Sequence, residues 1–227
     1  MNIREQLARL LEGKDLSERE SYKAFRGVFR QELGETDTKS LLLLLARKGE
    51  TLDEILGCLA ALRKLEPPDS VPLEGLIDTC GTGGDHSGSI NVSTLAAFVI
   101  AGAGGKVAKH GNRGISSRCG SSDLMEALGV NVAASKKKMI QAIRTRGLGY
   151  FHAPFYHPVF ARIQPLRRRL KTRTIFNFLG PLANPLKLKG QMIGVSRPQE
   201  VPRFANVLRR TGVQTAFVFC SSDGLDE

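Results

Sequence analysis

The chain has 227 residues, of which 41% are hydrophobic and 24% are charged, so it is long enough for one large domain or for a large and a small one. Its formal net charge of +11 favours anionic partners, such as phosphorylated metabolites, carboxylates or nucleic acid. No apolar run approaches membrane-spanning length and the N-terminus has no signal-peptide core, so we expect a cytoplasmic protein without a membrane anchor.

The first 66 residues predict helices only. Ser17-Glu-Arg-Glu20 and Thr51-Leu-Asp-Glu54 are capping-box patterns, and each predicts the start of a helix. The proline-rich segment 66–72 stops the last of these helices and marks a boundary. We therefore expect a helical domain over residues 1–70 and a second domain over residues 71–227.

After residue 72 the pattern changes to short apolar strands that alternate with helices. Strands are expected at 76–80, 106–108, 130–132, 149–152, 174–178, 191–195 and 216–220, and helices at 94–103, 121–128, 136–146, 156–171 and 199–210. This alternation predicts an α/β fold with a mostly parallel sheet. Because the chain stops directly after the last expected strand, we expect it to be incomplete at its C-terminus.

A glycine-bearing loop, residues 78–85, follows the first expected strand and leads into a helix that begins near Asn91, Ser93 and Thr94. Glycines allow backbone N–H groups to approach an anion, and the helix N-terminus adds its dipole. The loop matches neither the P-loop nor the dinucleotide-binding pattern. The three polar residues can cap the helix, bind a phosphate, or do both.

A second polar loop, Lys109-His-Gly-Asn-Arg113, ends the next expected strand. In a parallel sheet this loop and the first one lie at the same edge, where ligands bind. Two such loops predict a ligand with more than one phosphate group. Asp226 and Glu227 are either a solvent-facing turn or ligands for Mg²⁺, which takes one or two carboxylates together with phosphate oxygens.

These strings resemble the anthranilate phosphoribosyltransferase family along nearly the whole chain. The strings that carry the resemblance are Leu45–Thr51, Asp78–Asp85, Asn91–Thr94, Val107–Arg113, Gly120–Asp123, Glu126–Gly129, Tyr156–Pro158, Arg173–Asn177, Gly180–Leu182, Asn184–Pro185 and Asp226–Glu227. His86 and Lys171 stand where the family usually has glycine.

The resemblance implies a small N-terminal all-helical domain, on which the segment 156–171 packs, and a larger α/β domain of the nucleoside phosphorylase/phosphoribosyltransferase type. It implies a homodimer. It also implies a reaction of tryptophan biosynthesis, in which the phosphoribosyl group of phosphoribosyl pyrophosphate (PRPP) passes to anthranilate, with Mg²⁺ as cofactor and pyrophosphate as the product released.

The resemblance also implies three sets of site residues. PRPP would contact Gly81, Thr82, Gly83, Gly84, Asp85, Asn91, Ser93, Thr94, Lys109 and Ser121. Anthranilate would contact His110, Asn112, His157, Arg167 and Pro181, with Arg167 facing its carboxylate. Mg²⁺ would contact Ser93, Asp226 and Glu227. No residue is assigned as a covalent nucleophile, since direct displacement by a positioned amine needs none.

Two other functions remain open at this point. One is a pyrimidine-nucleoside phosphorylase-like enzyme, which shares the fold and a glycine phosphate loop. The other is a non-catalytic relative that binds nucleic acid through its basic surface. The string Lys109–Arg113 favours the transferase over the phosphorylase, and both phosphate loops together with the acidic pair argue against the nucleic-acid-binding protein.

Overall fold

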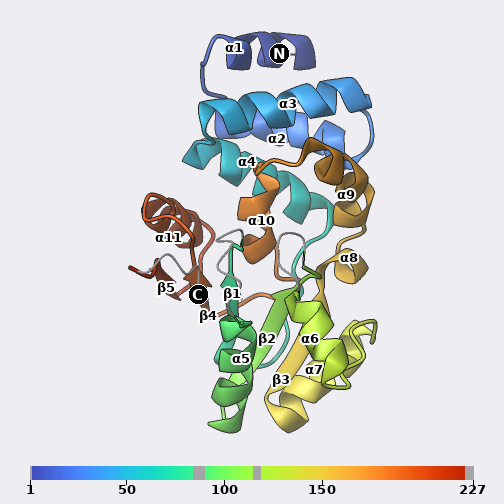
Figure 1. The fold of residues 1–227 in the computed structure, drawn as a ribbon, viewed down its shortest axis with the longest axis vertical. Helices are drawn as coiled ribbons and strands as arrows, with labels where there is room; N and C mark the ends of the chain where they lie inside the picture. The colour runs from blue at the N-terminus through green and yellow to red at the C-terminus, as the bar shows by residue number, and fades with distance from the viewer. Residues whose placement is uncertain (1, 84–89, 115–118, 223–227) are drawn as a thin grey trace. The chain divides into compact units, whose positions relative to one another are not determined.

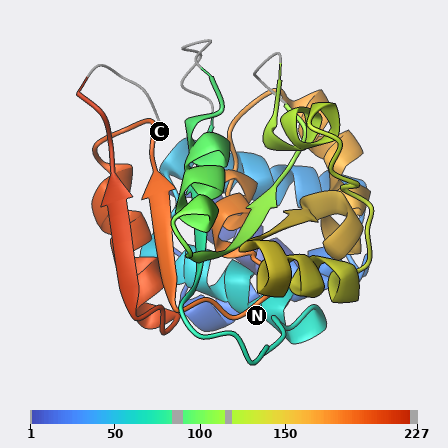
Figure 2. The ribbon, with the colours of Figure 1, turned by 90° about the horizontal axis from the view of Figure 1, so that it is seen from below.

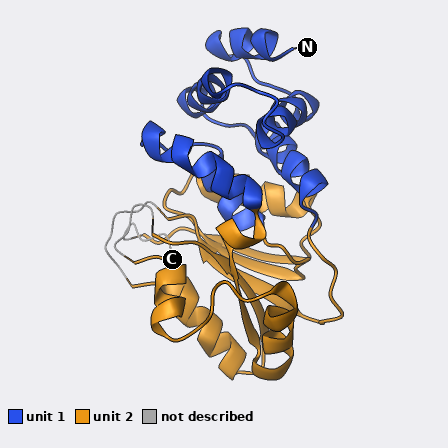
Figure 3. Cartoon of the chain, turned by 90° about the vertical axis from the view of Figure 1, so that its right-hand side faces the viewer, with its two compact units in different colours: residues 1–67, 158–183 blue, residues 68–157, 184–227 orange. Residues whose placement is uncertain are grey.

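The computed structural model describes residues 2–83, 90–114 and 119–222 (Figure 1). The chain forms two compact units (Figure 3). Unit 1 comprises residues 1–67 and 158–183, and unit 2 comprises residues 68–157 and 184–227. The domain boundary predicted at residue 70 is not tested by this division into compact units, and it stays a prediction.

Unit 1 consists of helices. They are α1 (Ile3–Leu11), α2 (Glu18–Phe29), α3 (Glu35–Lys48), α4 (Leu52–Leu65), α9 (Pro158–Leu170) and α10 (Phe176–Leu182). Both expected capping boxes are present, at the starts of α2 and α4. In the second, Glu54 is fully buried and also accepts from the Leu16 N–H at 2.9 Å and from Lys48 Nζ at 3.1 Å. This carboxylate therefore joins the start of α4 to the segment before α2 and to the end of α3.

The strand expected at 174–178 is wrong, because this segment forms the start of α10. Its apolar residues are buried at helical spacing: Ile175, Phe176 and Leu179 are at most 2% exposed. The Phe176 ring packs edge-on against Phe25 and Phe160, with ring centroids 6.4 and 6.2 Å apart. The β-branched and aromatic residues of this segment favour a strand locally. Packing of the aromatic face outweighs that preference and stabilises a helix.

Unit 2 contains the sheet. Its strands are β1 (Leu76–Gly81), β2 (Lys106–Gly111), β3 (Leu148–His152), β4 (Gly190–Gly194) and β5 (Thr215–Phe219). They are all parallel and lie in the order β3-β2-β1-β4-β5, which confirms the predicted α/β fold. From β1 the chain builds outward to β3 and then returns to β4 on the other side of β1. The point between β1 and β4 is therefore where such folds bind ligands.

The helices of unit 2 are α5 (Val92–Gly102), α6 (Ser121–Ala127), α7 (Lys136–Arg146), α8 (Ala153–Tyr156) and α11 (Glu200–Arg210). Helix α5 packs on β1 and β2, α7 on β3, and α11 on β5. Figure 2 shows α5 in front of the sheet and α11 behind it, so both faces are covered. Within the described ranges, no helix is both long and apolar enough to cross a membrane.

The strand expected at 130–132 is also wrong. The Val130 N–H is used at the end of α6, where it donates to the Met125 carbonyl at 2.9 Å. The Asn131 side chain then accepts from the Ala133 N–H at 3.0 Å and forms a local turn. Because backbone groups here are satisfied locally, the short apolar run packs as a loop, with Val132 buried.

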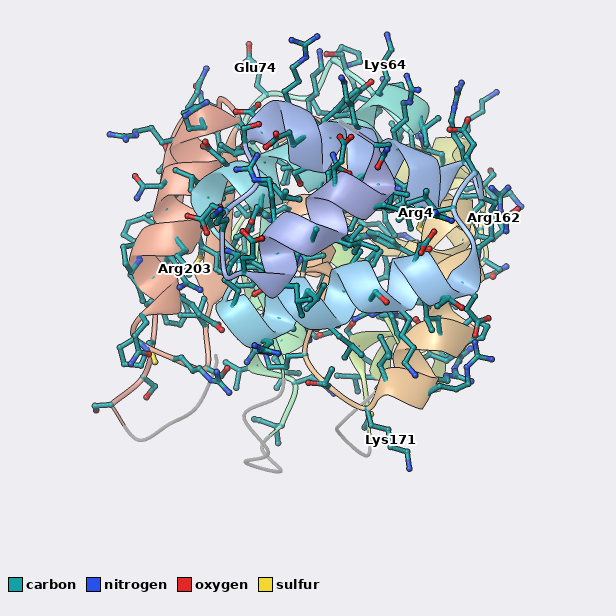
Figure 4. All side chains as sticks on the ribbon, turned by 90° about the horizontal axis from the view of Figure 1, so that it is seen from above. Arg4, Lys64, Glu74, Arg162, Lys171 and Arg203 are labelled. Carbon is teal, nitrogen blue, oxygen red and sulfur yellow. The ribbon has the colours of Figure 1, made fainter. Side chains whose placement is uncertain are left out.

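Lys171 in unit 1 has a φ of 49°, in the left-handed region that favours glycine. The residue is exposed, and its side chain extends away from the ribbon in Figure 4. The backbone therefore gives a physical reason for a glycine at this position, since lysine adopts the conformation at an energetic cost.

Gly57 in α4 is predicted to be intolerant of alanine. A Cβ there would meet the Glu18 carbonyl oxygen, Ser21 Cβ at 2.7 Å and Tyr22 N at 2.8 Å, all on α2. We expect Gly57→Ala to lower the free energy of unfolding by about 1–3 kcal/mol, measured by urea denaturation. Gly102→Ala in α5 is the matched control, since nothing lies within 4 Å of its added Cβ. Equal effects of the two substitutions would contradict the close approach of α2 and α4.

Candidate active site

The two polar loops begin at neighbouring strand ends in unit 2. Strands β1 and β2 are adjacent and parallel, so the residues after Gly81 and Gly111 leave the sheet at the same edge. On the other side of β1, the Thr82 N–H donates to the Gly194 carbonyl of β4 at 2.9 Å. Gly83 follows with a φ of 65°, in the left-handed region that favours glycine. The first loop therefore leaves the sheet at the point where the order of the strands reverses.

Lys109 is a buried lysine, only 1% exposed. From β2, its Nζ donates to the Thr79 carbonyl of β1 at 2.6 Å and to Ser93 Oγ of α5 at 3.2 Å. Thr79 Oγ1 in turn donates to the Ser93 carbonyl at 2.8 Å. These bonds bring two of the predicted PRPP residues, Lys109 and Ser93, into contact beside the first turn of α5.

Two buried hydroxyls, one just after β1 and one in the first turn of α5, have no partner among the described residues. Asn91 occupies the N-cap position, but its side chain makes no capping hydrogen bond. Thr82 Oγ1 and Thr94 Oγ1 are buried and have no hydrogen-bond partner among the residues that the structure describes. Buried hydroxyls normally have partners, so these two are fit to bind a ligand at the N-terminus of the helix.

A second group of predicted residues gathers beyond β2. The rings of His110 and His157 are both buried and stand edge to face, with centroids 5.4 Å apart. The Asn112 N–H donates to Ser121 Oγ at 3.2 Å. Asn112 Oδ1 accepts from the Arg113 N–H at 2.8 Å. Of the predicted anthranilate residues, unit 2 therefore places His110 against His157, and it connects the Asn112 loop to Ser121.

Arg113, the last residue of the second loop, is turned toward the acidic residues of α6. Its guanidinium lies 2.9 Å from Asp123 and 2.7 Å from Glu126. The hydrogen bonds that Arg113 donates to Glu126 and Asp123 hold its pKa above the ordinary value. The charge of Arg113 is thus neutralised within the protein, and its main role here is to connect the loop to α6.

Asp78 and Asn184 form a buried polar pair to which the sequence analysis assigns no role. Asp78 accepts from the His110 N–H at 3.2 Å and from Asn184 Nδ2 at 3.0 Å. Asn184 Nδ2 also donates to the Ala108 carbonyl at 2.7 Å. Both residues lie within strings that carry the family resemblance, but their contact spans 106 residues of sequence, which no local pattern reveals.

Burial raises the pKa of Asp78 to about 6, although Lys109, Asn184 and the His110 N–H act in the opposite direction. In the unfolded chain this carboxyl ionises near its ordinary pKa of 3.8. Between these two values the native state binds more protons than the unfolded state. The contribution of Asp78 to stability is therefore fully present below about pH 4 and is lost as the pH rises through about 6.

Arg167 and Pro181, the other two predicted anthranilate residues, belong to unit 1. Arg167 Cζ lies 5.3 Å from the centroid of the Phe176 ring. Burial lowers the pKa of Arg167 to about 10. No carboxylate of the described residues forms an ion pair with Arg167. A desolvated guanidinium without a carboxylate partner is suited to bind the carboxylate of a ligand. Pro181 is buried inside α10.

The remaining predicted residues, Gly84, Asp85, Asp226 and Glu227, lie outside the described residues. Across the described part of the chain, no group of three or more His, Cys, Asp or Glu residues is arranged to hold a metal ion. Ser93 Oγ is an oxygen donor at the start of α5. This donor set fits an ion such as Mg²⁺, which takes most of its ligands from substrate phosphates and water.

We predict that Asn184→Ala destabilises the protein in a pH-dependent way. Its amide stabilises the ionised form of Asp78, so the loss should be about 1–3 kcal/mol at pH 7.5 and smaller at pH 5, measured by urea denaturation. Asn131→Ala removes an exposed asparagine of the same unit and should show no such dependence. An equal loss at both pH values would show that Asn184 does not support the charge of Asp78.

Two known domain families match the sequence of the chain. The helical bundle domain of the glycosyl transferase family matches residues 4–65. The a/b domain of the same family matches residues 73–227. Together these matches agree with the helical and α/β parts of the fold.

Curated relatives and solved structures give a narrower identification. The anthranilate phosphoribosyltransferases of Teredinibacter turnerae and Solibacter usitatus are each 44% identical over all of this chain. The structure of the Thermus thermophilus enzyme has a TM-score of 0.88 at 38% identity over 97% of this chain. The Saccharomyces cerevisiae enzyme, in complex with PRPP and Mg, has a TM-score of 0.89 at 26% identity over 99% of this chain. The chain spans 67% of the length of each of these four proteins, and it belongs to the anthranilate phosphoribosyltransferase family.

Proposed function

We propose that the protein transfers the phosphoribosyl group of PRPP to anthranilate through the residues assigned above. PRPP binds at the carboxyl edge of the sheet of unit 2, through Gly81, Thr82, Gly83, Gly84, Asp85, Asn91, Ser93, Thr94, Lys109 and Ser121. Anthranilate binds through His110, Asn112, His157, Arg167 and Pro181. These assignments rest on the family resemblance together with the contacts of the described residues.

One observation carries the PRPP assignment. The buried ammonium of Lys109 lies 3.2 Å from Ser93 Oγ at the start of α5. Two threonine hydroxyls, of Thr94 in the same helix and of Thr82 just after β1, are buried without partners among the described residues. A buried cation, a helix N-terminus and unused hydroxyls together favour an anionic ligand with several oxygen acceptors. The phosphate groups of PRPP have this chemistry.

The reaction breaks the bond between the ribose anomeric carbon and the pyrophosphate oxygen. Positive charge develops on the sugar and negative charge on the departing pyrophosphate. Lys109 and the N–H groups at the start of α5 stabilise that negative charge without having to rearrange, because Lys109 is already held by Thr79 and Ser93. The amine of anthranilate forms the new bond to the same carbon as the pyrophosphate leaves, and it gives up one proton to the departing pyrophosphate or to water. Positioning is the main source of acceleration.

We also propose that Mg²⁺ is bound through Ser93, Asp226 and Glu227. When bound, the ion neutralises charge on the pyrophosphate. Ser93 supplies a hydroxyl oxygen for this purpose at the start of α5.

Arg167 provides the anthranilate assignment with its strongest support. The substrate has one carboxylate, and Arg167 is a desolvated guanidinium without a carboxylate partner in the described residues. A bidentate ion pair with the substrate would compensate this charge. His110 and His157, which pack against each other, offer aromatic surface for the substrate ring.

Homodimer formation and a cytoplasmic location are two further proposals, and both rest on the family resemblance alone. Size-exclusion chromatography with light scattering would measure the oligomeric state directly.

The proposed function predicts that anthranilate fluorescence falls when the full-length protein is mixed with anthranilate, PRPP and Mg²⁺. The loss should depend on all three additions and should be accompanied by pyrophosphate release. Phosphate-dependent cleavage of a pyrimidine nucleoside would identify the phosphorylase alternative instead. Salt-sensitive DNA binding without any turnover would identify the nucleic-acid-binding alternative.

Arg167→Gln is predicted to raise the KM for anthranilate by about tenfold or more, because it removes a charge-assisted hydrogen-bond donor. The KM for PRPP should change by less than about twofold on the same basis. The neighbouring Arg168 is exposed on the same helix, so Arg168→Gln is the matched control and should leave both constants near their original values. An unchanged KM for anthranilate in Arg167→Gln would disprove the carboxylate assignment.

A further inference from the structure

A chain of hydrogen-bonded side chains lies beneath the second loop, and of its members only Ser121 has a role in the function proposed so far. Tyr150 of β3 is 1% exposed, and its Oη lies 3.0 Å from Ser121 Oγ and 2.7 Å from Ser122 Oγ. Ser122 Oγ, which is fully buried, lies 2.7 Å from Nδ1 of His152. Four side chains from α6 and β3 are thus joined in one line, in the order His152, Ser122, Tyr150 and Ser121.

The line ends on the backbone of the second loop. Ser121 Oγ contacts both the N–H and the carbonyl of Asn112, each at 3.2 Å. The Ser122 N–H donates to the same carbonyl at 3.1 Å. A Cβ at Gly111 would overlap Ser121 Oγ and Tyr150 Oη, so the end of β2 approaches these hydroxyls as closely as only glycine permits. The loop and the hydroxyl chain therefore form one packed assembly.

Hydrogen-bond donation along these four side chains can run in one of two directions. Each hydroxyl has a single proton, and the Asn112 N–H is a fixed donor to Ser121. In one direction His152 Nδ1–H donates to Ser122, Ser122 to Tyr150, and Tyr150 to Ser121. In the other direction every donation is reversed, and the Ser121 hydroxyl donates its proton to Tyr150 Oη. Only the first direction leaves the Ser121 proton available for the Asn112 carbonyl or for a ligand.

His152 decides between the two directions. Burial, together with Arg113, lowers the pKa of His152, while Glu126 and Asp123 act in the opposite direction. The ring is therefore neutral at pH 7 and carries one proton, on Nδ1 or on Nε2. The Nδ1–H tautomer enforces the first direction, and the Nε2–H tautomer enforces the second.

We propose that Tyr150, Ser122 and His152 are positioning residues for the transfer reaction, which act through Ser121 by directing its hydroxyl proton toward PRPP. The inference rests on the proposed function, since Ser121 is assigned to PRPP there. The hydrogen bonds from β3 to α6 fix the orientation of the Ser121 hydroxyl before the substrate arrives. Binding therefore does not have to restrict the rotation of this hydroxyl.

A double-mutant cycle tests whether Tyr150 acts through Ser121. PRPP binding to the full-length protein is measured by titration calorimetry with Mg²⁺. Tyr150→Phe keeps the ring and removes the hydroxyl, and it should raise the Kd by about three- to tenfold. In a Ser121→Ala background the same substitution should have no further effect, whereas a merely structural role of Tyr150 would give independent, multiplying effects.

Tyr156→Phe is the matched control. It removes a tyrosine hydroxyl that is also hydrogen-bonded, to the Ala134 carbonyl at 2.6 Å, at a place outside the hydroxyl chain. Its Kd for PRPP should stay within about twofold of the original value. A rise equal to that of Tyr150→Phe would overturn the proposal.

A second measurement is made on the unsubstituted protein. Long-range ¹H–¹⁵N NMR spectra of the PRPP-bound protein report which ring nitrogen of His152 carries the proton, with His152→Gln used only to assign the signal. We expect the Nδ1–H tautomer. The Nε2–H tautomer, or multiplying effects in the cycle, would overturn this inference and leave the proposed function standing. Failure of the unsubstituted protein to bind PRPP would instead overturn both.

Discussion

The burial of two opposite charges on neighbouring strands constrains the carboxyl edge of the sheet. Asp78 is fully buried within β1, and Lys109 is 1% exposed within β2. Their attraction lowers the pKa of the carboxyl against the effect of burial. Because a buried charge is costly without partners, each strand end is held in place by the bonds that satisfy these groups.

These bonds suit the edge to the anion that is proposed to bind there. Lys109 holds the Thr79 carbonyl and the Ser93 hydroxyl, which fixes the start of α5 against β1. Asp78 holds the His110 N–H, which fixes the start of the second loop. A preorganised set of donors stabilises developing negative charge better than a mobile set, since no reorganisation is needed when the charge appears. The electrostatic cost of burial and the capacity for catalysis thus have the same origin.

The sequence predicts the fold and the candidate site to different depths. Capping boxes and the alternation of strands and helices identify α2, α4 and the parallel sheet, because these signals are local. The composition of segment 174–178 wrongly predicts a strand, because its helix depends on aromatic packing within unit 1. Lys109 and Ser93 stand in recognisable strings. The contacts of Asp78 with Asn184 and of Ser121 with Tyr150 join residues 106 and 29 positions apart, so only the structure reveals them.

Net charge alone does not locate the site. The chain has a formal charge of +11, yet many of its cations are exposed, such as Arg4, Lys64, Arg162 and Arg203 (Figure 4). Others are neutralised within the protein, as Arg113 is by Asp123 and Glu126. Arg167 differs from both groups, because it is desolvated and has no carboxylate partner among the described residues. A cation in that condition loses hydration without gaining an ion pair, and the carboxylate of the proposed substrate would supply that ion pair. The specific anion is therefore indicated by the few cations that folding desolvates, and the overall charge serves mainly to attract anions of any kind.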